Sequence, residues 1–190
     1  MSARRYRPVA ALPDWNVVVS VHETSFTWAR RFLSEYGMVG GTEFHNVLVM
    51  KVESPTQFLS TICQRWKEEP GISAHISRIA PATVTFDFRT PEEFEARAQE
   101  AVASWAFRLT GKKFHVRMHR RGLKGVLSSQ HEERVLDEAL LAALERAGAS
   151  GTVRFEDADA VIDIETISHR AGLALWSRDE LERYPFLKAG

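Results

Sequence analysis

The stretch that decides the fold is Lys112–Lys124, which reads KKFHVRMHRRGLK. Apolar side chains alternate there with polar ones, in the order Phe114, His115, Val116, Arg117, Met118 and His119. Successive side chains of a β-strand point to opposite faces. The alternation therefore predicts a strand with an apolar inner face and a basic outer face, followed by a turn at Arg120-Arg121-Gly122.

The same stretch gathers positive charge in a chain that is neutral overall. Lys and Arg number 25 and Asp and Glu number 25, so the formal net charge is zero. The stretch has no acidic residue, and its cations are Lys112, Lys113, Arg117, Arg120, Arg121 and Lys124. One dense basic element in a neutral protein favours a local contact with a polyanion. The alternative is that these cations only keep an exposed strand soluble.

The residues before this stretch predict a smaller α/β unit. Its elements follow the order strand, helix, two strands, helix and strand, and the clearest patterns lie at 15–21, 26–36, 47–52, 54–66 and 72–79. Ser54, Pro55 and Gln57 mark a helix start, because serine caps the first turn and proline fits its first position. This order is typical of a ferredoxin-like split βαβ unit.

The residues from Thr90 onward predict a second α/β layer, in which helices alternate with strands. Helical stripes cover 90–109 and 130–147, and strands are expected at 112–119, 152–155, 160–165 and 173–176. The predicted fold class is therefore α/β (α+β). The predicted organisation is a flexible N-terminal arm at 1–13, a ferredoxin-like domain at 14–88 and the second domain at 89–190.

Composition narrows the class of protein and its expected location in the cell. Apolar residues make up 44% of the chain, which is enough for packed cores. No stretch approaches the roughly 20 apolar residues that a membrane span needs, and the start has no secretory leader pattern. Cys63 is the single cysteine, so no intrachain disulfide can form and a cytoplasmic location is expected.

The sequence offers weak evidence for catalysis. It has no nucleophile-elbow, phosphate-loop or dinucleotide-binding glycine motif, and Cys63 lies on an apolar helix stripe. His115 and His119 lack a Cys or acidic neighbour in sequence, so neither a metal nor a cofactor is expected. The acidic residues of the region are Asp157, Asp159, Asp163 and Glu165. They could form an acid–base pair, but the favoured interpretation is structural, with Asp163 and Glu165 facing solvent or one carboxylate holding an Arg of the basic strand.

From about Thr90 onward, the order of these motifs resembles a THUMP domain. The matching pieces are the long helix, Phe114-His115-Val116-Arg117, the Arg120-Arg121-Gly122 turn, the helix at 130–147, the strand at 160–165, and Gly172-Leu173, Arg178 and Tyr184-Pro185-Phe186. The first half resembles the ferredoxin-like domain, often called NFLD, that usually precedes a THUMP domain. The resemblance covers nearly the whole chain.

The resemblance implies tRNA binding, commonly at the acceptor stem and its single-stranded end, with a base presented to a modification domain. Because the chain ends shortly after Phe186, it is most similar to a stand-alone THUMP protein that assists a separate tRNA cytidine acetyltransferase. It is therefore expected to be a non-catalytic adaptor with tRNA and a separate modification enzyme as partners. The alternatives are an unrecognised RNA-modifying enzyme, using Asp163 or Glu165 with His169, and a protein-interaction module with an exposed apolar sheet face on residues 15–86.

An A-form stem presents phosphates and 2′-hydroxyls, which suit Arg and Lys, and exposed bases stack on aromatic rings. Helix N-termini add backbone N–H donors, and a helix begins near Ser129. The residues expected to contact RNA are Lys112, Lys113, His115, Arg117, His119, Arg120, Arg121, Lys124, Trp176, Arg178 and Arg183.

Overall fold

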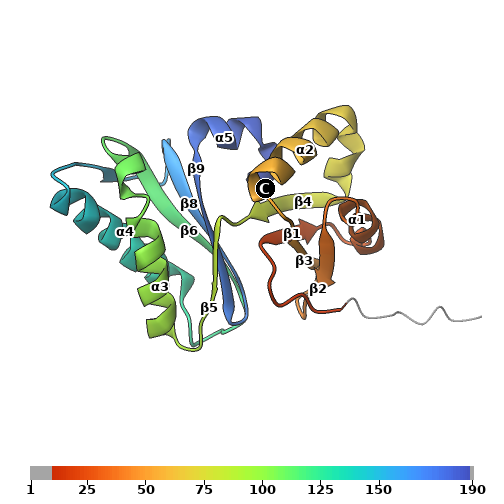
Figure 1. Cartoon of the computed structure of the whole chain (residues 1–190), viewed down its shortest axis with the longest axis horizontal. Helices are drawn as coiled ribbons and strands as arrows, with labels where there is room; N and C mark the ends of the chain where they lie inside the picture. The colour runs from red at the N-terminus through yellow and green to blue at the C-terminus, as the bar shows by residue number, and fades with distance from the viewer. Residues whose placement is uncertain (1–9, 189–190) are drawn as a thin grey trace, which may run out of the picture. The chain divides into compact units, whose positions relative to one another are not determined.

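The computed structural model describes residues 10–188, and the chain divides into two compact units between Ile79 and Ala80 (Figure 1). The sequence-based boundary lies after Phe88, so residues 80–88 join the second unit rather than the first. Most of the expected flexible arm, residues 1–9, lies outside the described residues. None of the described helices is long and apolar enough to cross a membrane.

Unit 1 has the element order expected of a ferredoxin-like domain. Its elements are β1 (Val17–Val21), α1 (Phe26–Leu33), β2 (Met38–Gly41), β3 (Val47–Lys51), α2 (Pro55–Glu68), the 3-10 helix η1 (Pro70–Ala74) and β4 (Ile76–Pro81). The sheet order is β2-β3-β1-β4, and β3 pairs antiparallel with both β1 and β2. The one local difference is η1, which replaces the start of the strand expected at 72–79.

The sheet of unit 1 is covered at its centre. Consecutive residues are buried along Val17–Val19 and Val47–Met50, and consecutive strand residues point to opposite faces. Residues on both faces of β1 and β3 are therefore buried. Cys63 is buried on α2, as expected of a core residue.

The described end of the expected arm is attached to this sheet. Ala11 forms a parallel bridge with Gly41, and the Gly41 N–H donates to the Ala10 carbonyl at 3.0 Å. A Cβ on Gly40 would lie 2.4 Å from Leu12 Cβ, so only glycine fits where this segment crosses β2. Residues 10–12 are thus part of the folded unit.

Unit 2 contains a five-stranded mixed sheet. Its elements are β5 (Val84–Asp87), α3 (Pro91–Ala103), η2 (Ala106–Leu109), β6 (Lys113–Arg121), α4 (Ser129–Arg146), β7 (Thr152–Val153), β8 (Ala160–Ile167), β9 (Arg170–Ser177), α5 (Arg178–Arg183) and η3 (Pro185–Leu187). The order is β5-β9-β8-β6-β7. β6 pairs parallel with β8 and β7, and β9 pairs antiparallel with β8 and β5.

The core of unit 2 forms between one face of this sheet and the helices α3 and α4. Phe114, Val116 and Met118 of β6 are buried in it, together with Phe94 of α3 and Leu136 of α4. The apolar inner face predicted for the Lys112–Lys124 stretch is therefore confirmed.

Helix α4 also provides hydrogen-bond acceptors for the N–H groups of β6 that β7 does not pair with. β7 pairs only with Lys113 and Phe114. Further along, the Val116 N–H donates to Asp137 Oδ1 at 3.0 Å and the Met118 N–H donates to Glu133 Oε1 at 2.8 Å. Two carboxylates thus accept backbone hydrogen bonds that another strand would otherwise take.

Candidate nucleic-acid interface

The cations of strand β6 are divided between its two faces. Lys113, Arg117 and Arg121 share the face opposite the core, because they alternate with the buried apolar residues. Arg120 lies on the other side, where it lines a pocket with the core residue Leu127. Arg120 and Arg121 were expected to lie in a turn, but they are the last two residues of β6 and therefore point to opposite faces.

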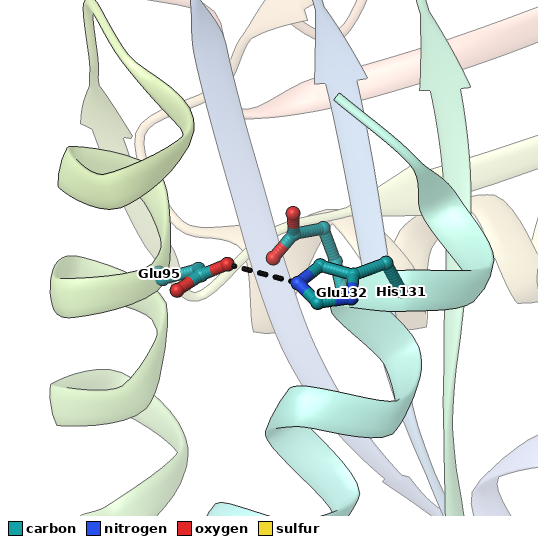
Figure 2. A group of neighbouring side chains, drawn as sticks. All are labelled: Glu95, His131 and Glu132. Atoms are coloured by element: carbon teal, nitrogen blue, oxygen red, sulfur yellow. Dashed lines mark ion pairs between the residues drawn. The ribbon is translucent and has the colours of Figure 1, made fainter. Parts of the chain in front are cut away.

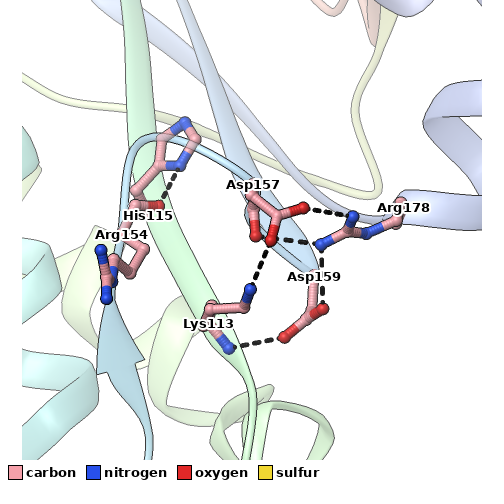
Figure 3. A network of polar contacts seen from close by, with 6 residues as sticks. All are labelled: Lys113, His115, Arg154, Asp157, Asp159 and Arg178. Carbon is pink, nitrogen blue, oxygen red and sulfur yellow. Dashed lines mark hydrogen bonds and ion pairs between the residues drawn. The ribbon is translucent and has the colours of Figure 1, made fainter.

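At its first residues, β6 enters a network of charges with the loop before β8 (Figure 3). Lys113 Nζ donates to Asp157 Oδ2 at 2.6 Å, and the Lys113 N–H donates to Asp159 Oδ2 at 2.8 Å. Arg178 donates to Asp157 Oδ1 at 2.5 Å and to Asp159 Oδ1 at 3.1 Å. Two of the expected RNA-binding cations, Lys113 and Arg178, are thus neutralised by carboxylates.

This network holds its carboxylates ionised. The hydrogen bond from Lys113, followed by that from Arg178, lowers the pKa of Asp157 to about 2. The pKa of Asp159 is lowered chiefly by the hydrogen bond from the Lys113 backbone. The pKa of Arg178 is raised chiefly by its hydrogen bond to Asp157. All three charges are therefore present at neutral pH.

At its last residues, β6 buries its charges against β8. Arg121 Nη1 donates to Glu165 Oε2, and His119 Nε2 lies 3.7 Å from Asp163 Oδ1. The Glu165 side chain is 3% exposed and the Asp163 side chain 8%. Asp163 and Glu165 were expected to face solvent. They are buried instead, because the parallel pairing of β6 with β8 brings the two sets of charges together.

The second form of the structural interpretation, in which a carboxylate of the acidic strand holds an Arg, is the one that the structure shows. A carboxylate does hold an Arg of the basic strand, as the Arg121–Glu165 pair shows. The catalytic alternative would join Asp163 or Glu165 to His169. His169 instead packs its ring against Phe88, with centroids 5.9 Å apart, and its Nδ1 lies 3.2 Å from the Phe88 carbonyl oxygen.

Three cations of the stretch are exposed and unpaired. Lys112, Arg117 and Lys124 form no ion pair with any residue from 10 to 188. Lys112 precedes β6, Arg117 lies at its middle on the face opposite the core, and Lys124 follows its end. At about 3.3 Å per strand residue, Lys112 and Arg117 are separated by roughly 16 Å along the strand. The unpaired charge is therefore spread over the length of β6 and the residues next to its two ends.

The pocket of Arg120 lies at the start of helix α4. It is open, with a volume of about 410 Å³, and its lining residues are Arg120, Gly125, Val126, Leu127, Ser128, Ser129 and Gln130. Arg120 Nη1 donates to the Gly122 carbonyl. The Ser128 side chain accepts from the His131 N–H at 3.4 Å, which caps the helix. The first N–H groups of a helix have no acceptor within it, so this end favours anions.

The aromatic residue that is exposed and could stack on a base is not the one that the sequence suggested. Trp176 is 5% exposed, so its ring is not presented for stacking on a base; its position on β9 turns it toward a covered face. Phe155, which sequence reasoning did not select, is 65% exposed, and its ring centroid lies 5.3 Å from that of His115. His115 Nδ1 in turn lies 2.9 Å from the Arg154 carbonyl oxygen. The available signal was an aromatic residue at the end of a short strand, next to an acidic loop.

The remaining candidates lie at either end of the sheet face. Arg183 is exposed at the end of α5. His119, Asp163 and Glu165 bring potential metal-ligand atoms within 4.8 Å of one another, which sequence spacing alone concealed. Glu165 is already bound by Arg121, however, so this cluster acts as an ion-pair network.

Comparisons with known proteins identify the fold. No protein-family model and no curated protein matches the sequence. Among solved structures, PH1313 from Pyrococcus horikoshii, a THUMP-domain protein, matches with a TM-score of 0.58 and 17% identity over 85% of this chain and 54% of its own. TrmN from Thermus thermophilus matches with a TM-score of 0.54 and 11% identity over 85% of this chain and 44% of its own.

A third solved structure, a possible methylase from Clostridium difficile, has a TM-score of 0.52 and 9% identity over 85% of this chain and 40% of its own. This chain therefore spans about half the length of these solved chains or less. At such low identity the likeness concerns the fold, which is a mixed α+β fold of the THUMP-like kind, as the sequence predicted.

Proposed function

We propose that the chain binds tRNA through unit 2, with Lys112, Arg117 and Lys124 on the phosphate backbone. The observation that carries this proposal is the set of exposed cations on β6 and next to its two ends that no carboxylate of residues 10–188 neutralises. Cations spaced along a strand suit an extended polyanion better than a single small anion. The THUMP-like fold adds support, since the sequence resemblance to that family implies the same partner.

Two further features of unit 2 suit RNA. Arg120 and the first N–H groups of α4 line a pocket of suitable polarity for one phosphate. The exposed ring of Phe155 offers a stacking surface for an unpaired base near a tRNA end. Phosphates provide most of the affinity and little sequence selectivity, so the bound tRNAs would be distinguished mainly by shape.

The test is filter binding of bulk tRNA at several salt concentrations. The variant Lys112→Ala/Arg117→Ala/Lys124→Ala is expected to bind more weakly. The slope of log affinity against log salt is expected to flatten by about 2, since each lost phosphate contact removes about 0.7–0.9. Arg121 is left unchanged, because its removal would expose a buried carboxylate and confuse loss of binding with loss of folding.

A matched control removes the same charge from the helical side of unit 2. Arg89, Arg134 and Arg146 are exposed and form no ion pair with the described residues. The variant Arg89→Ala/Arg134→Ala/Arg146→Ala should keep the affinity and salt slope of the parent. Equal losses in both variants, or none in the first, would show that β6 does not form the RNA surface.

The finer proposal is that the chain is a cytoplasmic, non-catalytic adaptor that presents tRNA to a separate modification enzyme, such as a cytidine acetyltransferase. The contacts of His169 support it, because its ring and Nδ1 lie against Phe88, whereas acid–base catalysis needs convergent groups. The purified chain should form no product from tRNA and an acetyl or methyl donor, and should co-purify with an enzyme that does. Product formed by this chain alone would contradict the adaptor role.

A further inference from the structure

A second cluster of titratable side chains lies away from β6, between helices α3 and α4. Figure 2 shows Glu95 of α3 facing His131 and Glu132 of α4. Glu95 Oε1 lies 3.3 Å from His131 Nε2, and one potential ligand atom from each residue lies within 4.8 Å of the other two. This cluster takes no part in the proposed RNA surface.

The backbone positions of the two α4 residues are set by the helix cap. The Ser128 side chain accepts from the His131 N–H at 3.4 Å, and the Ser128 carbonyl accepts from the Glu132 N–H at 2.9 Å. Across from them, Thr90 caps α3 by accepting from the Glu93 N–H at 3.2 Å. Glu95 therefore lies in a regular part of its helix, one turn in, and can reach toward α4.

Glu132 is the unusual member of the cluster. The residue is 1% exposed, yet its Oε2 is buried with no hydrogen-bond partner among the described residues. Leaving a buried carboxylate oxygen unsatisfied costs more than a typical hydrogen bond contributes. The oxygen belongs to a side chain that points at Glu95 and His131, so the missing partner would lie among these three residues.

The geometry points to a divalent transition-metal site, with zinc as the simplest occupant, held by Glu95, His131 and Glu132. Zinc is bound by imidazole nitrogen and carboxylate oxygen at about 2.0–2.2 Å. At tetrahedral angles such distances place two ligand atoms roughly 3.3–3.5 Å apart. The Glu95–His131 separation of 3.3 Å already agrees with that spacing.

The remaining ligand can approach without disturbing the core. Glu132 is fixed by burial, whereas the His131 and Glu95 side chains are 58% and 29% exposed and free to rotate toward it. The exposed side leaves room for water as a fourth ligand, as in open zinc sites. An imidazole with two carboxylates also suits Mn²⁺ or Fe²⁺, but the order of affinities places zinc above both.

A shared proton is the competing explanation for the paired carboxyls. Burial, followed by the charge of Glu95, raises the pKa of Glu132 to about 7, and Glu92 acts in the same direction. The carboxyl groups of Glu95 and Glu132 thus face one another beside the His131 ring. A shared proton would join only the two carboxyl groups, whereas a metal ion would also engage the His131 nitrogen and satisfy the oxygen of Glu132.

The experiment titrates the chelator-treated full chain with Zn²⁺ at pH 8 by calorimetry and repeats the titration with Co²⁺ by visible absorption. The parent should bind one zinc ion, and Co²⁺ should give visible ligand-field bands. In His131→Ala and Glu95→Gln, zinc affinity should fall about tenfold or more, as expected when one ligand of three is lost. The Co²⁺ bands should disappear in both variants.

His45→Ala is the matched control, because His45 is an exposed histidine of unit 1 that could bind zinc adventitiously. It should keep the parent's affinity. His131 is itself exposed, so His131→Ala should fold, which circular dichroism can verify. Absence of saturable zinc binding in the parent, or equal affinity in the parent and His131→Ala, would overturn the assignment.

A further variant separates the metal from the proton. Glu132→Gln removes the buried charge, so without metal it should melt higher than the parent at pH 8. Added zinc should raise the melting temperature of the parent in a concentration-dependent way and leave that of Glu132→Gln unchanged. An equal zinc-induced rise in both would show that the metal binds elsewhere and that the cluster only shares a proton.

Discussion

The two ends of strand β6 hold their cations in different surroundings. At the first residues, Lys113 pairs with Asp157 on a largely exposed loop, where the Asp157 side chain is 64% exposed. At the last residues, Arg121 pairs with Glu165, which is 3% exposed. One strand thus carries a solvated ion pair at one end and a buried ion pair at the other.

The difference shows that a run of cations in a sequence is not a run of cations on a surface. Lys113 and Arg121 are neutralised by carboxylates 44 residues away in sequence. Lys112, Arg117 and Lys124, from the same stretch, remain exposed without an ion pair among residues 10–188. The first group stabilises the fold to a degree set by burial, and the second group is available to a partner.

Removing Arg121 tests the buried end and should give the largest effect on stability. Arg121→Ala leaves the buried Glu165 carboxylate without its guanidinium, so we expect a loss of about 3–5 kcal/mol in the free energy of unfolding. Urea denaturation measures this loss. Arg117→Ala, which removes an exposed cation of the same strand face, should change stability by less than about 0.5 kcal/mol.

A double variant identifies the cause of that loss. Arg121→Met/Glu165→Gln removes both charges, so it should recover part of the stability that Arg121→Ala loses. If the double variant is as unstable as the single one, the loss comes from packing of the arginine stem rather than from the unpaired carboxylate.

Much of unit 2 was accessible from the sequence, because local rules decide it. The period of two placed Phe114, Val116 and Met118 inside, and the residues opposite them outside the core. The same rule says which residues share a face but not whether that face is covered. Asp163 and Trp176 were expected to be exposed for this reason, and both are buried.

Strand pairing is the second feature that the sequence could not predict. Whether β6 lies beside β8 depends on contacts between residues far apart in sequence, which no local pattern contains. The ion pairs of Lys113 and Arg121 follow from that arrangement. The cluster of Glu95, His131 and Glu132 likewise depends on a long-range contact, that of α3 with α4. The unpaired cations could be suspected from the sequence, but only the fold distinguishes them from the paired ones.

Asp137 of α4 is a buried carboxyl group next to β6 that has no ion pair with the described residues. Burial raises the pKa of Asp137 to about 7, against the lowering effect of the hydrogen bond from the Val116 N–H. The folded chain therefore holds a proton there that the unfolded chain releases near pH 4. Native protein binds more protons between about pH 4 and pH 7, so stability should fall as pH rises through that window.

Asp137→Asn should remove this contribution while keeping an oxygen for the Val116 N–H. We expect the variant to be more stable than the parent at pH 8, by on the order of 2 kcal/mol, and its stability to depend less on pH. Glu132 titrates in the same direction, so some pH dependence should remain. Urea denaturation at pH 5 and pH 8 measures both. Asp137→Leu, which leaves the N–H without an acceptor, is the control, and an equal loss in Asn and Leu would contradict this explanation.

A substitution at the exposed end of β6 should change the stability of the fold least and should act mainly on tRNA binding. Asp157→Asn removes the carboxylate that Lys113 and Arg178 share, and an exposed pair contributes little to folding. Because the pKa of Asp157 is lowered to about 2, its contribution is present at neutral pH and is lost only as pH falls below about 4. Lys113 is then released and Arg178 keeps only Asp159 as an ion-pair partner among the described residues, so both should add to the charged surface of β6. Affinity for tRNA should rise, and the salt slope should steepen by up to about 0.9 for each cation that reaches a phosphate.

Asp179→Asn is the control, because it removes an exposed charge of α5 that has no such pairs and should leave the salt slope unchanged. Identical salt slopes in the parent and both variants would mean that Lys113 and Arg178 lie outside the RNA surface, which would then be confined to the cations that the fold leaves unpaired.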